Sequence, residues 1–135
     1  MGHSMGGHGA LTLGLRHPEI YRSVSAFAPI VAPMQVPWGQ KAFAGYLGED
    51  REAWREHDAT ELVARRPRAD TIRIDVGTAD GFLEKQLKPE LFLAAAERAG
   101  QPVEYHARDG YDHGYWFIQT FVHEHMAFHA QRLML

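Results

Sequence analysis

Met1-Gly2-His3-Ser4-Met5-Gly6-Gly7-His8-Gly9-Ala10-Leu11 opens this 135-residue chain and decides its fold. The segment from Gly2 to Gly6 fits the pattern G-x-S-x-G, in which a strand ends, the chain turns sharply and a helix begins at once. Ser4 occupies the turn, where a strained backbone holds its hydroxyl above the sheet. We expect a Cβ at Gly2 or Gly6 to collide where strand and helix cross, and Gly7 and Gly9 to let the helix lie close on the sheet.

A five-residue pattern of this kind also occurs by chance, and the alternative interpretation is a flexible Gly-Ser turn. Two features favour a reactive serine. An apolar helical pattern follows immediately, with Ala10, Leu11, Leu13 and Leu15 before His17-Pro18. Acid and base candidates then follow in the order that this fold requires.

Composition excludes several classes of protein. The net charge of -3 offers no basic surface for nucleic acid and no polybasic patch for a membrane. No apolar run is long enough to span a bilayer, and nothing near Met1 resembles the apolar core of a signal peptide. The absence of cysteine excludes disulfides, zinc-thiolate sites and a cysteine nucleophile, and it fits a reducing compartment.

Strand and helix patterns alternate along the rest of the chain. Strands are predicted over 24–28, 72–76 and 103–107, and helices over 41–47, 50–57, 59–65 and 90–99 and from 115 onward. An irregular loop, 33–39, carries Trp38, for which packing in the loop and lining of a pocket are both open interpretations. The cluster Arg65-Arg66-Pro67-Arg68 is interpreted as a solvated face. The last helix has an apolar stripe of Phe117, Ile118, Phe121, Val122 and Leu133.

This alternation predicts an α/β domain with a parallel sheet and right-handed crossovers. The strand that should deliver Ser4 is expected to be missing from the sequence, because only Met1 stands where a strand residue belongs. We therefore expect residues 1–135 to form a single, partial domain that is truncated at its N-terminus and keeps a three-stranded parallel sheet flanked by helices.

Three residues stand where ligand sites form, beyond the carboxyl ends of strands: Ser4, Asp80 and His113. A serine hydroxyl is a weak nucleophile, so a neutral imidazole must remove its proton, and a carboxylate must orient that imidazole. Histidine, with a pKa of about 6.5, suits a base that later returns the proton. The rival carboxylates are Asp75, which lies inside a strand, and Asp109 and Asp112, which are too close to His113 to come from a separate strand end.

An oxyanion hole needs two backbone amides, and the N–H of Met5, the residue after the serine, is one of them. The second normally comes from a loop after an earlier strand, which we do not find in this sequence.

The last helix carries His125 and His129, four residues apart on one face. This spacing is compatible with a metal. However, His123-Glu124 is followed by Ala127 where a zinc-protease motif requires histidine. The favoured interpretation is therefore surface or interface histidines and no metal.

These motifs together resemble the S-formylglutathione hydrolase (esterase D) family, in the C-terminal half of its members. The resemblance runs essentially end to end, through the stretches 1–11, 21–30, 37–43, 45–48, 58–60, 77–83, 86–87, 89–90, 110–113 and 115–118.

The resemblance implies an α/β-hydrolase fold in which Ser4 is the nucleophile, Asp80 the acid and His113 the general base. It implies hydrolysis of S-formylglutathione to glutathione and formate, a step of formaldehyde detoxification, and cleavage of small carboxylic esters. It also implies a cytoplasmic, often dimeric enzyme without a cofactor, and a position for Trp38 near a small acyl pocket. The alternatives are a general short-chain carboxylesterase and a catalytically inactive fragment. In this family the first half supplies the early strands and the second oxyanion donor, and without it one sheet edge would be open.

Overall fold

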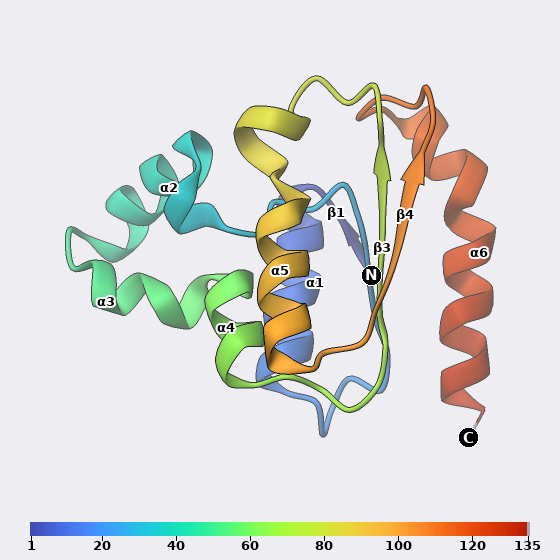
Figure 1. Cartoon of the computed structure of the whole chain (residues 1–135), viewed down its shortest axis with the longest axis horizontal. Coiled ribbons are helices and arrows are strands. Elements are labelled where there is room, and N and C mark those ends of the chain that lie inside the picture. The colour runs from blue at the N-terminus through green and yellow to red at the C-terminus, as the bar shows by residue number, and fades with distance from the viewer. Residues whose placement is uncertain (135) are drawn as a thin grey trace.

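The chain folds into a four-stranded parallel sheet with helices on both faces (Figure 1). The computed structural model describes residues 1–134. The strands follow the order of the sequence across the sheet, as β1 (Gly2–His3), β2 (Val24–Phe27), β3 (Ile72–Gly77) and β4 (Val103–Arg108). The α-helices are α1 (Met5–Arg16), α2 (Pro37–Leu47), α3 (Arg51–Trp54), α4 (Ala59–Arg65), α5 (Pro89–Ala99) and α6 (Tyr115–Leu133). Three short helical segments complete the chain, at Pro33–Gln35, Arg55–His57 and Leu83–Leu87.

The predicted α/β class is confirmed, but the predicted number of strands is wrong. The two residues before Ser4 form β1, which pairs in parallel with β2 through Gly2 opposite Ala26 and His3 opposite Phe27. Two residues are too few to produce a strand pattern in the sequence, so only their pairing reveals the strand. As a result, Ser4 does follow a strand within this chain.

Helices cover the two faces of the sheet unequally. Helices α1, α4 and α5 lie on one face, and α6 lies alone on the other (Figure 1). The first face is apolar: Ile72, Ile74 and Val76 of β3 join the main core there with Leu11 of α1 and Phe92 of α5.

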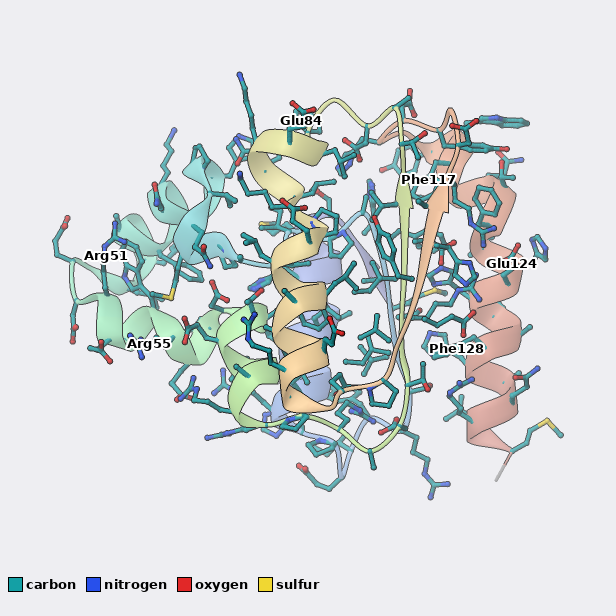
Figure 2. The ribbon with its side chains drawn as sticks, in the orientation of Figure 1. Arg51, Arg55, Glu84, Phe117, Glu124 and Phe128 are labelled. Carbon is teal, nitrogen blue, oxygen red and sulfur yellow. The ribbon has the colours of Figure 1, made fainter. Side chains whose placement is uncertain are left out.

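Helix α6 packs on the sheet through Phe117 and Phe128, which lie between it and the strands (Figure 2). The expected apolar stripe is confirmed for Phe117, which is in the core, and for Ile118, Phe121 and Val122, which pack against it. It is wrong for Leu133, which is 62% exposed. None of the helices within residues 1–134 has the length and apolar character needed to cross a membrane.

Capping residues set several helix boundaries. Asp58 caps α4 by accepting hydrogen bonds from Thr60 and Glu61, and Gly100 ends α5 in the left-handed conformation. Helix α2 begins earlier than the pattern indicated, because Pro37 occupies its first turn, where the missing N–H is not needed. Trp38 therefore lies in the first turn of α2 and not in an irregular loop.

The basic cluster at the end of α4 is not uniformly solvated. Arg65 and Arg66 are exposed, but Arg68 is 6% exposed. Its guanidinium donates to Asp70 and to the carbonyls of Gly14 and Tyr21, so it joins the end of α1 to the start of β3. The interpretation as a solvated face is therefore wrong for Arg68.

Candidate active site

Ser4 lies in a sharp turn between β1 and α1. Its φ of 58° and ψ of -116° are in a region that side chains rarely occupy. The turn is held by two backbone hydrogen bonds, from Ser4 N–H to the carbonyl of Phe27 (2.9 Å) and from Ile30 N–H to the carbonyl of Ser4 (3.3 Å). Strain of this kind persists only where the surroundings hold it, and it is concentrated at functional sites.

Close packing explains two of the four glycines around Ser4. A Cβ on Gly2 would lie 2.0 Å from the carbonyl oxygen of Gly6, and a Cβ on Gly7 would lie 3.0 Å from the Cβ of Pro29. Strand and helix can cross closely only because these two positions lack side chains. For Gly6 and Gly9, an added Cβ would meet nothing within 4 Å in residues 1–134, so the expectation of a collision or close packing there is wrong.

Asp80 and His113 come together at the carboxyl end of the sheet. His113 Nδ1 lies 2.6 Å from Asp80 Oδ2, although 33 residues separate them. The Asp80 carboxylate is buried and also accepts the N–H of Phe82 at 2.9 Å. This second bond fixes the carboxylate. Because Nδ1 of His113 faces the carboxylate, Nε2 is the ring nitrogen that can accept a proton.

Aromatic rings hold His113 on two sides. The ring of His3, the residue before Ser4, lies 4.6 Å from the His113 ring between centroids. The ring of Phe82 lies 5.1 Å away on its edge. Burial, followed by the charge of His113, lowers the pKa of His3. A neutral His3 therefore packs on His113 without opposing its protonation, and it connects the turn at Ser4 to the Asp80–His113 pair.

The loops that carry Asp80 and His113 are packed on one another. A Cβ on Gly77 would lie 2.1 Å from the carbonyl oxygen of Tyr111, and the N–H of Ala79 donates to that carbonyl at 3.0 Å. The two rival carboxylates in this region support the loops, because Asp109 accepts from Thr78 and Asp112 accepts from the N–H of Gly114.

An apolar cavity of about 370 Å³ lies beside Ser4. Trp38 is among its lining residues, with Ser4, Met5, His8, Ile30, Pro33, Gly39, Ala42, Phe43 and Tyr46. Gln86 holds the first turn of α2 by accepting the N–H of Trp38 at 3.0 Å, and the Trp38 ring packs 4.7 Å from the Phe82 ring. Trp38 thus borders the same space as Ser4, and through Phe82 it is in contact with the surroundings of His113.

Met5 is the first residue of α1. The first N–H groups of a helix have no carbonyl one turn earlier to accept them. The Met5 amide is therefore available to an anion beside Ser4, and the helix dipole favours negative charge at this position.

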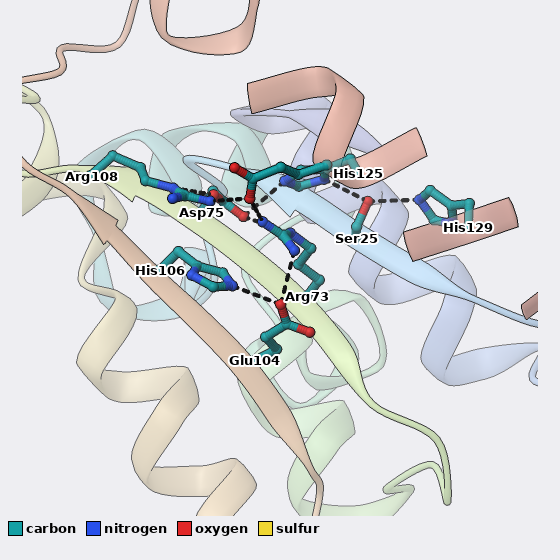
Figure 3. A network of polar contacts seen from close by, with 9 residues as sticks. Ser25, Arg73, Asp75, Glu104, His106, Arg108, His125 and His129 are labelled. Atoms are coloured by element: carbon teal, nitrogen blue, oxygen red, sulfur yellow. Dashed lines mark hydrogen bonds and ion pairs between the residues drawn. The ribbon is translucent and has the colours of Figure 1, made fainter. Parts of the chain in front are cut away.

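A second Ser-His-Asp arrangement lies on the opposite face, beneath α6 (Figure 3). His125 Nδ1 lies 2.9 Å from Ser25 Oγ, and His125 Nε2 lies 2.8 Å from Asp75 Oδ1. All three residues are fully buried, so no substrate can reach the Ser25 hydroxyl. Ser4, by contrast, lines the apolar cavity described above.

The prediction of surface or interface histidines on the last helix holds for His123, which is exposed, but it is wrong for His125. His125 is fully buried, and His129 hydrogen-bonds to Ser25 through Nε2 (2.7 Å) and to Ser23 through Nδ1 (2.6 Å). Within residues 1–134, no group of three or more His, Cys, Asp and Glu residues is arranged to hold a metal ion. Sequence reasoning missed this cluster, although Ser25, Arg73 and Asp75 are polar residues that alternate with apolar ones in the buried strands β2 and β3.

Comparison with known proteins identifies the family of the chain. The model of the Esterase family ("Putative esterase") matches residues 1–128. The S-formylglutathione hydrolase of Paracoccus denitrificans (strain Pd 1222) is 49% identical over 132 residues, which are 98% of this chain and 47% of that protein. The chain thus spans about half the length of this relative.

Solved structures show the same fold. A structure of an S-formylglutathione hydrolase from Agrobacterium tumefaciens superimposes with a TM-score of 0.94 at 50% identity, over 97% of this chain and 47% of the other. An S-formylglutathione hydrolase from Staphylococcus aureus, at 20% identity, superimposes with a TM-score of 0.71 over 93% of this chain and 51% of the other. Because the family model covers nearly the whole chain and the fold agrees, this chain belongs to the Esterase family.

Proposed function

We propose that this chain carries the catalytic centre of a serine thioesterase that hydrolyses S-formylglutathione to glutathione and formate. The observation that carries the proposal is the 2.6 Å contact between Asp80 and His113, joined to the strained turn at Ser4 by the ring of His3. Sequence identities of 49% and 50% to two S-formylglutathione hydrolases support this choice of substrate.

In this mechanism, the Ser4 hydroxyl attacks the thioester carbonyl while Nε2 of His113 takes its proton. The Asp80 carboxylate holds Nδ1–H of His113 and stabilises the imidazolium that forms. The Met5 N–H donates to the oxyanion, and His113 returns the proton to the departing sulfur as the C–S bond breaks. Water, activated by His113, then releases formate from the formyl ester on Ser4 and restores the serine hydroxyl.

The apolar cavity beside Ser4 is assigned to the acyl side of the substrate, with Trp38 as a wall. We further propose that the reaction serves formaldehyde detoxification in the cytoplasm without a cofactor, and that the active enzyme is a homodimer. The zero cysteine content is compatible with a reducing compartment. Sedimentation of the protein at several concentrations tests the dimer.

The test of the proposed reaction is a comparison of kcat/KM for S-formylglutathione and for p-nitrophenyl acetate. We expect the thioester to be the better substrate and Ser4→Ala to abolish turnover of both. Asp109→Asn is the control, because Asp109 contacts Thr78 through an exposed hydrogen bond that an amide oxygen can still accept. Higher kcat/KM for longer acyl esters would instead indicate a general carboxylesterase, and no turnover by the parent chain would contradict the proposal.

A further inference from the structure

The face of the sheet beneath α6 carries polar side chains in a connected set. Ser23 immediately precedes β2, and its hydroxyl lies 2.6 Å from His129 Nδ1 of α6. Ser25 lies within β2, between His125 and His129 of α6 (Figure 3). In β3, Oδ1 of Asp75 lies 2.8 Å from Nε2 of His125, and it accepts a hydrogen bond from Nε–H of Arg73 at 3.0 Å. These contacts form a continuous chain from the half-buried Ser23 to the fully buried Asp75.

The charged end of this chain sets the direction of every hydrogen bond in it. Burial alone would raise the pKa of Asp75, but hydrogen bonds from His125 and Arg108 bring it to about 2, so the group is a carboxylate that only accepts. His125 therefore donates through Nε2–H. Burial lowers the pKa of His125, and it lowers the pKa of His129 to about 4, so both rings are neutral at pH 7.

A neutral ring that donates through Nε2 must accept through Nδ1. His125 Nδ1 therefore accepts from the Ser25 hydroxyl, and the Ser25 oxygen in turn accepts from Nε2–H of His129. His129 Nδ1 then accepts from the hydroxyl of Ser23. Each of the four contacts has one donor and one acceptor, so the two imidazoles are fixed in the same tautomer.

The same residues hold the backbone that supports Ser4. The His125 ring is stacked on the ring of Phe27 at 3.8 Å with an angle of 18° between the planes. The carbonyl of Phe27 accepts the N–H of Ser4, and the carbonyl of Asp75 accepts the N–H of Ala28 at 2.8 Å. Ala28 has a φ of 43°, so two strained residues, Ser4 and Ala28, are held by carbonyls of residues that contact His125.

We propose that the hydrogen-bonded chain Ser23–His129–Ser25–His125–Asp75, here named the α6 relay, positions the nucleophile by fixing Phe27 and Asp75 behind Ser4. Its members are positioning residues, since none of them touches the reacting atoms. The proposal rests on the proposed function of Ser4. Loss of the relay lets the Phe27 carbonyl and the strained turn relax, so that Ser4 Oγ moves out of line with His113. Displacements of about 1 Å in such a site reduce rates by up to about 100-fold.

The main variant is Ser25→Ala, which removes the hydroxyl at the centre of the relay. Ser23→Ala is a milder variant, because it removes only the half-buried end. Val63→Ala is the matched control: Val63 is fully buried in α4, on the other face of the sheet, so it weakens the core without touching the relay. All three are made in the full 135-residue chain.

Two measurements test the relay. The first is the rate constant for modification of Ser4 by a fluorophosphonate at saturation, for which we expect a loss of about tenfold or more in Ser25→Ala and a nearly parental value in Val63→Ala. The second is amide hydrogen exchange at Ser4 and Ala28. We expect Ser25→Ala to increase the exchange rates of both amides by more than the drop in global stability explains. In Val63→Ala, the exchange rates should increase only through global unfolding.

Long-range ¹⁵N–¹H spectra of the histidine rings add a direct reading. We expect the Nε2–H tautomer for both His125 and His129, and an Nδ1–H tautomer for either ring would overturn the relay. The relay would also be overturned if Ser25→Ala matched Val63→Ala in both measurements. If Ser25→Ala does not fold, Ser23→Ala and the ring spectra decide the question.

Failure of the proposed function has a different signature. In that case the fluorophosphonate leaves Ser4 of the parent chain unmodified, while hydrogen exchange and the ring spectra still report on the relay.

Discussion

At the scale of single residues, the side chains of Asp80, His3 and Phe82 fix the orientation of His113 in the candidate site. One ring nitrogen is bound to a buried carboxylate at 2.6 Å, and rings of His3 and Phe82 pack against the imidazole. The remaining nitrogen is the one that a general base requires. An imidazole that is held on three sides has one orientation, which is the condition for efficient proton transfer.

Asp80→Asn tests the orienting bond. The amide keeps the shape of the side chain, but it favours the wrong tautomer of His113, so we expect modification of Ser4 by a fluorophosphonate to slow by roughly 10³–10⁴-fold. Asp109→Asn should stay near the parental rate. A rate for Asp80→Asn within a few-fold of the parent would contradict the role of Asp80.

His8 provides a test of pH dependence. Its Nε2 accepts the N–H of Ala59 at 3.2 Å, and burial lowers the pKa of His8 to about 4. Because the unfolded chain has a histidine pKa of about 6.5, it binds the proton more readily than the folded chain does. The free energy of unfolding should therefore fall as the pH drops from about 6.5 to about 4, by on the order of 2 kcal/mol for this residue, and show no further His8 contribution below that range.

Urea unfolding at several pH values measures this effect. His8→Gln keeps an acceptor for Ala59 but cannot be protonated, so its stability should fall less over the same pH range. Parallel curves for His8→Gln and the parent would show that His8 does not contribute to the pH dependence.

At the scale of elements, loops and caps bring the site together. Asp58 is almost fully buried between the segment at Met34 and the start of α4, and its carboxylate accepts the N–H groups of Met34, Thr60 and Glu61. It therefore holds α4 to the segment that precedes α2. Helix α2 in turn carries Trp38 at the cavity.

Asp58→Ala should lower the free energy of unfolding by about 2–3 kcal/mol, because it removes a helix cap and leaves buried N–H groups without an acceptor. Asp58→Asn, which keeps one oxygen acceptor, should lose clearly less. Thermal or urea unfolding of both variants checks this difference, and equal losses would mean that the hydrogen bonds of the carboxylate contribute little.

Elements also show how far the sequence could predict this molecule. The elbow pattern predicted the turn at Ser4, and strand ends predicted that Asp80 and His113 would share one edge of the sheet. Strand β1 was missed because its two residues have no strand pattern of their own. Only their pairing with β2 makes them a strand. The relay was missed because polar residues that alternate in a strand usually indicate a solvated face, whereas here α6 covers Ser25 and supplies its polar partners.

At the scale of the whole molecule, the sheet has an apolar rim along β1. No strand in residues 1–134 pairs with the outer edge of β1. A cavity of about 310 Å³ lies beside this edge, and its lining includes Met1, Leu13 and Tyr21, each of which is between 42% and 53% exposed. Edges of this kind pair readily with other chains.

We therefore expect the chain to self-associate through the β1 edge. Leu13→Lys places a charge in this rim and should shift the protein toward monomer in analytical ultracentrifugation, with weaker binding of an apolar dye. Leu133→Lys is the control, because Leu133 is also exposed (62%, against 48% for Leu13) but lies at the far end of α6. Unchanged association of Leu13→Lys would place the interface elsewhere.

The central claim is that residues of this chain assemble a reactive serine. The most direct test is the intact mass of the chain after treatment with a fluorophosphonate, with Ser4→Ala and His113→Ala measured beside it. The account predicts one adduct per parent chain and none on Ser4→Ala, with His113→Ala modified at least about 10³-fold more slowly. A parent chain without an adduct, or an adduct that persists in Ser4→Ala, would contradict it.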